Sequence, residues 1–125
     1  MLLDTHTFLW FLNEDANLPP VLKQQIENAD AVFVSIVSIW EIAIKLNVGK
    51  LTLLTPFETL DADIAASKIE ILPLTFESAV AYRSLPLHHR DPFDRMLVAQ
   101  ALTHSLVLVS RDAILDAYKV QRLWE

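Results

Sequence analysis

The segment AVFVSIVSIWEIAIKLNVG, residues 31–49, predicts a buried strand followed at once by a helix. Residues 31–36 are rich in β-branched side chains, which favour a strand over a helix. Ser38-Ile39-Trp40-Glu41 has the S-x-x-E spacing of a capping box, and apolar residues then recur at helical intervals until Gly49. We therefore expect the helix to begin near Ser38.

The same alternation of strands and helices extends in both directions from this segment. Apolar runs that predict strands occupy residues 1–3, 69–74 and 106–109, and helical spacing is found at residues 5–12, 21–29, 56–68, 75–83 and 93–104. No two-residue hairpin signal separates the strands. The sequence therefore predicts one α/β domain over residues 1–125, in which helices cover both faces of a central parallel sheet.

The composition excludes several classes of protein. With one glycine, Gly49, the chain cannot form the glycine-rich phosphate cradles of P-loop and Rossmann proteins. With no cysteine it can form no disulfide, thiolate zinc site or iron–sulfur cluster, and we expect a cytoplasmic protein. The apolar N-terminal run is too short for a signal peptide or a membrane span, so we expect no contact with a membrane.

Four acidic residues come from separate junctions between strands and helices. Asp4 follows the first strand, Glu41 and Asp94 lie in the first turns of two predicted helices, and Asp112 follows the apolar run LVLVS. Each has a local explanation as a helix cap or turn residue, and Asp91 before Pro92 is a further N-cap candidate. Helix capping does not explain why four such acids share the carboxyl edge of one sheet, where ligands bind in this class of fold.

A cluster of carboxylates at this edge predicts a metal site. Two like charges about 4 Å apart repel by roughly 4 kcal/mol at an effective dielectric of 20, so the cluster needs protonation or a cation. Oxygen ligands select Mg²⁺ or Mn²⁺, and either ion can activate water for phosphodiester hydrolysis. The net charge of −6 argues against binding of nucleic acid through bulk charge. Phosphate chemistry would therefore depend on the metal.

Hydroxyl groups and histidines give weaker indications. Thr5 and Ser38 lie beside two of the acids, where they could position water or phosphate or could cap helices. The histidines are not arranged with a serine and an aspartate as in a Ser-His-Asp triad. We therefore expect metal chemistry at this edge in place of a side-chain nucleophile.

These motifs resemble the PIN-domain family and, within it, the VapC-type ribonuclease toxins of bacterial toxin–antitoxin pairs. The resemblance covers nearly the whole chain and rests on LLDTHTFLW, SIVSIWEIAIKLNVGKL, HHRDPFDRMLVAQAL and LVLVSRDAIL. It implies a metal-dependent endoribonuclease.

By motif position, the resemblance assigns the metal to Asp4, Glu41 and Asp94. Asp112 would hold a second ion or support the first, and Thr5 or Ser110 would take the hydroxyl position of the family. The motif DPFD contains two acids. We assign catalysis to Asp94 and leave the role of Asp91 open.

The resemblance also implies a VapB-like antitoxin bound along the apolar helices near the site, and a homodimer. Four aromatic residues could contact a partner or belong to the core: Trp10, Phe11, Trp40 and Trp124. Basic residues near two of the acids could contact RNA phosphates or form a solvated surface: His88, His89, Arg90, Arg95 and Arg111.

Two other functions share part of this pattern. A phospho-acceptor receiver domain also carries an acidic, Mg²⁺-binding edge, but here Thr5 follows Asp4, and Ser110-Arg111 replace the lysine that the receiver design needs after the last strand. A PIN-like module that binds RNA or a partner without cutting would keep the fold. The complete set of four acids favours the nuclease.

Overall fold

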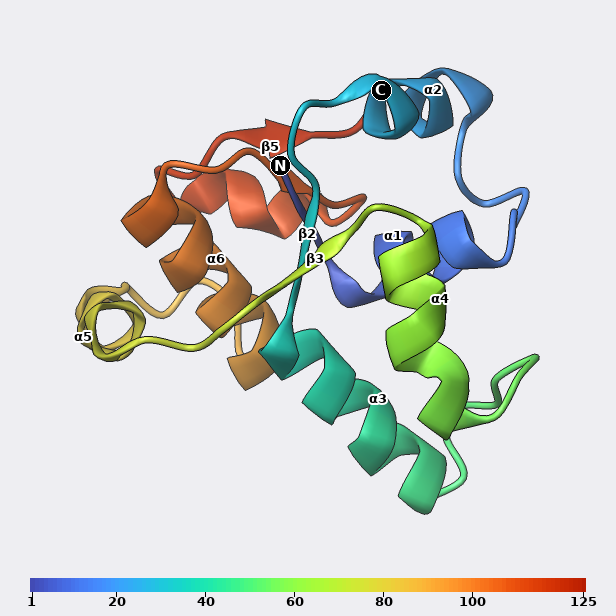
Figure 1. Ribbon diagram of the computed structural model, residues 1–125. Coiled ribbons are helices and arrows are strands. Elements are labelled where there is room, and N and C mark those ends of the chain that lie inside the picture. The colour runs from blue at the N-terminus through green and yellow to red at the C-terminus, as the bar shows by residue number, and fades with distance from the viewer.

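Five parallel strands form the central sheet in the order β3-β2-β1-β4-β5 (Figure 1). The computed structural model describes residues 1–125. The strands are short: β1 Leu2–Leu3, β2 Phe33–Ser35, β3 Glu70–Leu72, β4 Leu108–Val109 and β5 Arg122–Leu123. The predicted α/β class is confirmed. Receiver domains have the strand order 2-1-3-4-5, so this order excludes them.

Helices cover both faces of the sheet, as predicted. Figure 1 shows α1 and α4 on one side of the strands and α5 and α6 on the other. The helices are α1 Thr5–Leu12, α2 Pro20–Asn28, α3 Ile36–Asn47, α4 Leu60–Ala66, α5 Phe76–Ser84 and α6 Pro92–His104. Two 3₁₀ helices complete the chain, η1 Phe57–Thr59 and η2 Ala113–Ala117.

The central strand β1 divides the core into two clusters. Leu2 and Leu3 are adjacent, so their side chains point to opposite faces of the sheet, and both are fully buried. Leu3 packs with Phe8 of α1 and Leu22 of α2, among others. Leu2 packs with residues that include Leu97 of α6. Burial of both faces explains why the strand is a continuous apolar run.

The predicted capping box at Ser38 is wrong. Helix α3 begins at Ile36, and its N-cap is Ser35, whose hydroxyl oxygen accepts a hydrogen bond from Val37 N at 3.0 Å. The same Ser35 hydroxyl donates to Gln100 Oε1 of α6 at 2.5 Å. Ser38 and Glu41 therefore lie inside the helix, and Glu41 is in its second turn. β-branched residues fit a strand or a buried helix, so the composition of residues 31–36 did not locate this junction.

Two other predicted helix starts are confirmed, whereas the helix predicted over residues 56–68 consists of η1 followed by the shorter α4. Thr75 caps α5 and Asp91 caps α6, each through its side chain. Strand β5 was not predicted, because its two half-buried residues lie in no apolar run. None of the helices combines the length and the apolar character that crossing a membrane requires.

Candidate metal centre

An acidic cleft of about 430 Å³ opens where β1 and β4 end and α1 and α6 begin. The structure brings all four predicted acids into it, together with Asp91 and with His89, which was predicted only as a possible RNA contact. The remaining lining residues are Thr5, His6, Trp10, Lys45 and Arg111. The cleft thus contains five carboxylates and two lysine or arginine side chains.

Asp4 serves as a helix cap and as a cleft residue at the same time. Its Oδ1 accepts a hydrogen bond from Thr7 N at 2.9 Å, which caps α1. Its backbone N–H donates to Val109 O at 3.0 Å and so fixes Asp4 beside the end of β4. Oδ2 of Asp4 accepts no hydrogen bond. One oxygen is therefore committed to the helix and the other is free for a ligand.

Glu41 is held by hydrogen bonds to both carboxylate oxygens. Its side chain is buried, with Oε2 accepting from Lys45 Nζ at 2.6 Å and Oε1 lying 2.6 Å from Thr5 Oγ1. Thr5 Oγ1 also lies 2.9 Å from Ser38 Oγ. A threonine hydroxyl has one proton and a carboxylate can only accept, so Thr5 donates to Glu41 and accepts from Ser38. Thr5 and Ser38 therefore orient Glu41 and cap no helix.

The contact with Glu41 also changes the pKa of Lys45. The hydrogen bond from Lys45 to Glu41 raises the pKa of the lysine, and the negative charges of Glu41, Asp91 and Asp94 add to this effect. The lysine thus remains charged beside Glu41. Its positive charge balances the negative charge of one carboxylate of the cleft.

Asp94 and Asp91 lie together at the start of α6. Asp91 Oδ1 accepts from Phe93 N at 2.8 Å and from Asp94 N at 3.2 Å, so one oxygen of Asp91 is committed to the cap. Asp94 Oδ1 accepts no hydrogen bond. Asp94 thus presents a free oxygen to the cleft, whereas Asp91 has a clear structural role.

Asp112 enters the cleft from the segment after β4. Its Oδ1 accepts from Ile114 N at 3.1 Å and caps η2. Its backbone N–H donates to Ser110 Oγ at 3.1 Å. Ser110 is fully buried, so its hydroxyl supports the backbone of Asp112 and does not face the cleft.

His89 completes the cluster from the loop before α6. Its Nε2 lies 2.9 Å from Asp112 Oδ2 and 3.3 Å from Asp94 Oδ2. One ligand atom from each of these three residues lies within 4.8 Å of the others, a spacing that could hold a metal ion. The sequence placed His89 only among candidate RNA contacts. The one sequence feature that could have indicated a place in the cleft is its position two residues before Asp91 in HHRDPFD.

Arg95, predicted as a possible RNA contact, is engaged in contacts within the protein. Arg95 is 8% exposed, and its guanidinium donates to Pro86 O at 2.9 Å, Leu85 O at 3.4 Å and the Tyr118 hydroxyl oxygen at 3.2 Å. These contacts hold the loop before α6 in place. Arg90 and Arg111 are exposed, and Arg111 lines the cleft.

The charge balance of the cleft favours a cation. Burial, together with the nearby carboxylates of Asp91 and Asp4, raises the pKa of Asp94 to about 7, against a lowering by His89. Free carboxylate oxygens on Asp4 and Asp94, in a cleft without sulfur ligands, suit a hard divalent cation. The residues present therefore fit a metal site.

Comparison with known proteins agrees with this interpretation. The PIN domain family matches residues 1–121 of the chain. Ribonuclease VapC22 of Mycobacterium tuberculosis is 30% identical over 125 residues, which cover 98% of this chain and 94% of the relative. The chain shares its fold with VapBC2 from Rickettsia felis bound to a DNA fragment from their promoter, with a TM-score of 0.71 at 13% identity, covering 98% of this chain and 96% of that one. DNA-bound VapBC from Salmonella typhimurium gives 0.70 at 17% identity, with 98% and 95% covered.

We predict that Asp94 contributes stability to the metal-free protein and that this contribution is lost as the pH rises from about 4 to about 7. The pKa of Asp94 is about 7 in the folded chain and about 3.8 in the unfolded one, so the folded state binds the proton more tightly over this range. This stabilisation, of up to a few kcal/mol, is complete below the unfolded pKa and is lost through the folded one.

Urea unfolding in EDTA across this pH range measures the effect. Asp94→Asn is neutral at every pH, so the difference in unfolding free energy between the variant and the wild type should change with pH. A constant difference would show that Asp94 ionises normally.

Proposed function

The chain belongs to the PIN-domain family, and from this we propose that it is a divalent-metal-dependent endoribonuclease that acts as the toxin of a VapBC-type toxin–antitoxin pair. The observation that carries the proposal is the convergence of Asp4, Glu41, Asp94 and Asp112 on one cleft. We assign these four residues to catalysis through Mg²⁺ or Mn²⁺. We also propose that residues 1–125 form one domain and that the protein acts in the cytoplasm.

The residues of the cleft have different roles in the proposed reaction. When bound, the divalent ion supplies a water of lowered pKa and a positive charge beside the phosphodiester. Asp4 and Asp94 would offer their free oxygens to the ion. Glu41, held by Thr5 and Lys45, would do so from a fixed orientation.

Contacts with RNA phosphates are assigned to two exposed arginines. Arg111 lies in the cleft next to Asp112 in sequence, and Arg90 precedes Asp91. Arginine pairs with phosphate through charge-assisted hydrogen bonds, so both could draw the RNA backbone toward the acids. A module that binds RNA without cutting remains the alternative, and the first experiment below separates the two.

We propose that the antitoxin binds at a second cavity. This cavity of about 650 Å³ lies between α1, α2, α4 and the segment 53–55. Its apolar lining residues include Leu9, Leu12 and the exposed Leu54. Half of its 14 lining residues are apolar, and surfaces that bind an amphipathic helix combine an apolar groove with polar edges in this way.

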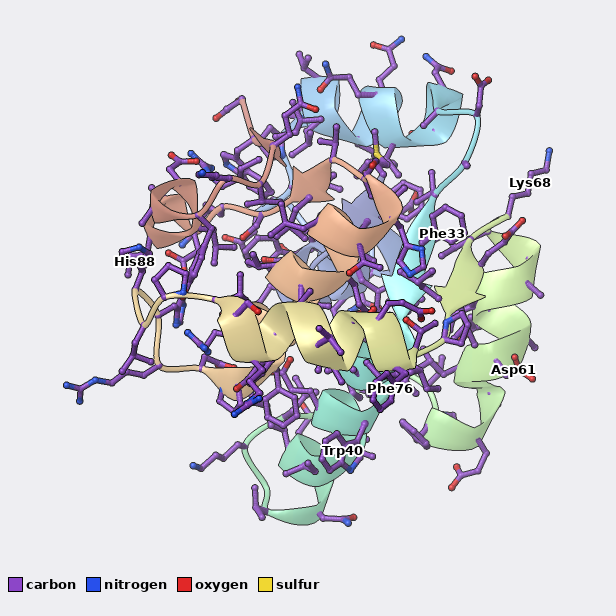
Figure 2. The ribbon with its side chains drawn as sticks, turned by 90° about the vertical axis from the view of Figure 1, so that its left-hand side faces the viewer. Phe33, Trp40, Asp61, Lys68, Phe76 and His88 are labelled. Atoms are coloured by element: carbon purple, nitrogen blue, oxygen red, sulfur yellow. The ribbon has the colours of Figure 1, made fainter.

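A homodimer contact is proposed for the exposed apolar side chains of α3 and α5. Phe76 is 83% exposed and Trp40 62% exposed (Figure 2), and Val80 adds a further exposed apolar residue on α5. Apolar surface of this kind is typical of contacts between proteins. The partly buried Trp10, Phe11 and Trp124 pack instead against the core.

We predict that Asp94→Asn abolishes cleavage of RNA in the presence of Mg²⁺ or Mn²⁺. The amide cannot supply the negative charge that the ion requires, so the rate should fall by at least about 100-fold. Asp61→Asn is the matched control, because Asp61 lies exposed on the outer side of α4 (Figure 2). Full activity of Asp94→Asn would remove this residue from the site, and cleavage in excess EDTA would refute the metal mechanism.

We predict that expression of the chain alone arrests bacterial growth, and that co-expression of the small reading frame beside its gene relieves the arrest. Growth curves of the two strains measure this. Leu54→Glu should keep the toxicity and weaken the relief, because it places a charge in the apolar cavity. Harmless expression of the wild-type chain would favour a binding module.

We predict that the isolated protein is a dimer by size-exclusion chromatography with light scattering, and that Phe76→Glu shifts it toward the monomer. A buried charge at the contact must lose its hydration without gaining a partner. Leu54→Glu is the control, because Leu54 is as exposed as Phe76 but belongs to the other surface. A dimer unaffected by Phe76→Glu would place the contact elsewhere.

A further inference from the structure

His89 occupies a place in the cleft that two different roles could explain. Its Nε2 is 2.9 Å from Asp112 Oδ2 and 3.3 Å from Asp94 Oδ2. Two ligands at right angles around an ion, each about 2.1 Å from it, are about 3 Å apart. The same distances also suit a ring N–H that donates to a carboxylate. The position of Nε2 therefore does not distinguish a metal ligand from a hydrogen-bond donor.

The other ring nitrogen does distinguish them. His89 Nδ1 accepts a hydrogen bond from Asp91 N at 3.1 Å, so Nδ1 must carry a lone pair. A neutral imidazole has one ring proton, which is then on Nε2. Histidines that bind metals usually donate their second ring N–H to a carboxylate, carbonyl or water, whereas here the second nitrogen faces a donor. His89 thus points a proton, and not a lone pair, at the acids.

The loop that carries His89 is fixed by two buried side chains. The Tyr118 hydroxyl oxygen accepts from His88 N at 3.2 Å and from His89 N at 3.0 Å. Arg95 donates to the same oxygen and to Pro86 O. These contacts fix the backbone on both sides of His88, so the imidazole enters the cleft in a defined orientation.

Resting on the proposed function, we propose that His89 is a positioning residue that holds Asp112 in the metal site as an Nε2–H donor, and that it is not itself a metal ligand. The Asp112 side chain is 35% exposed, against 25% for Asp94, and is therefore freer to turn toward solvent. With Oδ1 held by Ile114 N and Oδ2 by His89, the carboxylate has one orientation. Each of these oxygens keeps a further lone pair for an ion.

The first test measures Mn²⁺ binding by the disappearance of the free-ion electron paramagnetic resonance signal. We expect His89→Ala to bind Mn²⁺ about 10 to 100 times more weakly, as is typical when the support of a ligand is lost. His89→Gln should recover most of the affinity, because its amide N–H can donate to Asp112. His104→Ala is the control, because His104 is exposed in the last turn of α6, at the opposite end of that helix from Asp94.

The second test asks directly whether nitrogen is bound to the ion. Electron spin-echo envelope modulation of the wild-type Mn²⁺ complex should show no coupling to a directly coordinated ¹⁴N nucleus. Such a coupling, lost in His89→Ala, would overturn the proposal, as would wild-type affinity in that variant. Unfolding of each variant in EDTA, followed by circular dichroism, verifies that it is folded.

The two proposals fail in different ways. A protein that binds Mn²⁺ with the expected order of affinities but does not cut RNA would refute the nuclease and leave the role of His89 intact. A protein that cuts RNA and shows a coordinated ¹⁴N would support the nuclease and refute the proposed role of His89.

Discussion

Repulsion between carboxylates is the constraint on which the rest of this structure depends. The parallel sheet brings acids from distant parts of the chain to one edge, where burial makes their charges costly to bring together. The chain meets this cost with fixed backbone and side-chain donors: Thr7 N for Asp4, Thr5 and Lys45 for Glu41, and Ile114 N for Asp112. Asp94 has no comparable donor to its carboxylate, and its raised pKa records the cost that remains.

The same donors show why helix capping and metal binding are not competing explanations. A carboxylate has two oxygens, and Asp4 uses one for the cap of α1 and leaves the other free. Asp112 caps η2 with one oxygen and accepts from His89 with the other. Capping fixes each side chain to a rigid helix start, which is the preorganisation that a metal site needs. A local role for an acid therefore does not count against a functional one.

The sequence predicted the parallel sheet and most helices, because apolar periodicity and proline positions depend on near neighbours. It misplaced the start of α3, where β-branched residues fit either a strand or a buried helix. It also placed His89 and Arg95 near the acids only as possible RNA contacts or as a solvated surface, and it did not predict the contacts that they make. Their contacts with Asp112 and Tyr118 join residues more than 20 positions apart, and no short motif encodes such pairs.

The position of β1 in the sheet has a consequence for when activity appears during synthesis. β1 is made first, yet it lies between β2 and β4, and residues near 108 must be made before its second edge is paired. Asp112 is synthesised long after Asp4, so a nascent polypeptide that has not reached residue 112 lacks one of the four acids. The cleft can assemble only after Asp112 has emerged from the ribosome, so a shorter nascent chain cannot have the complete site.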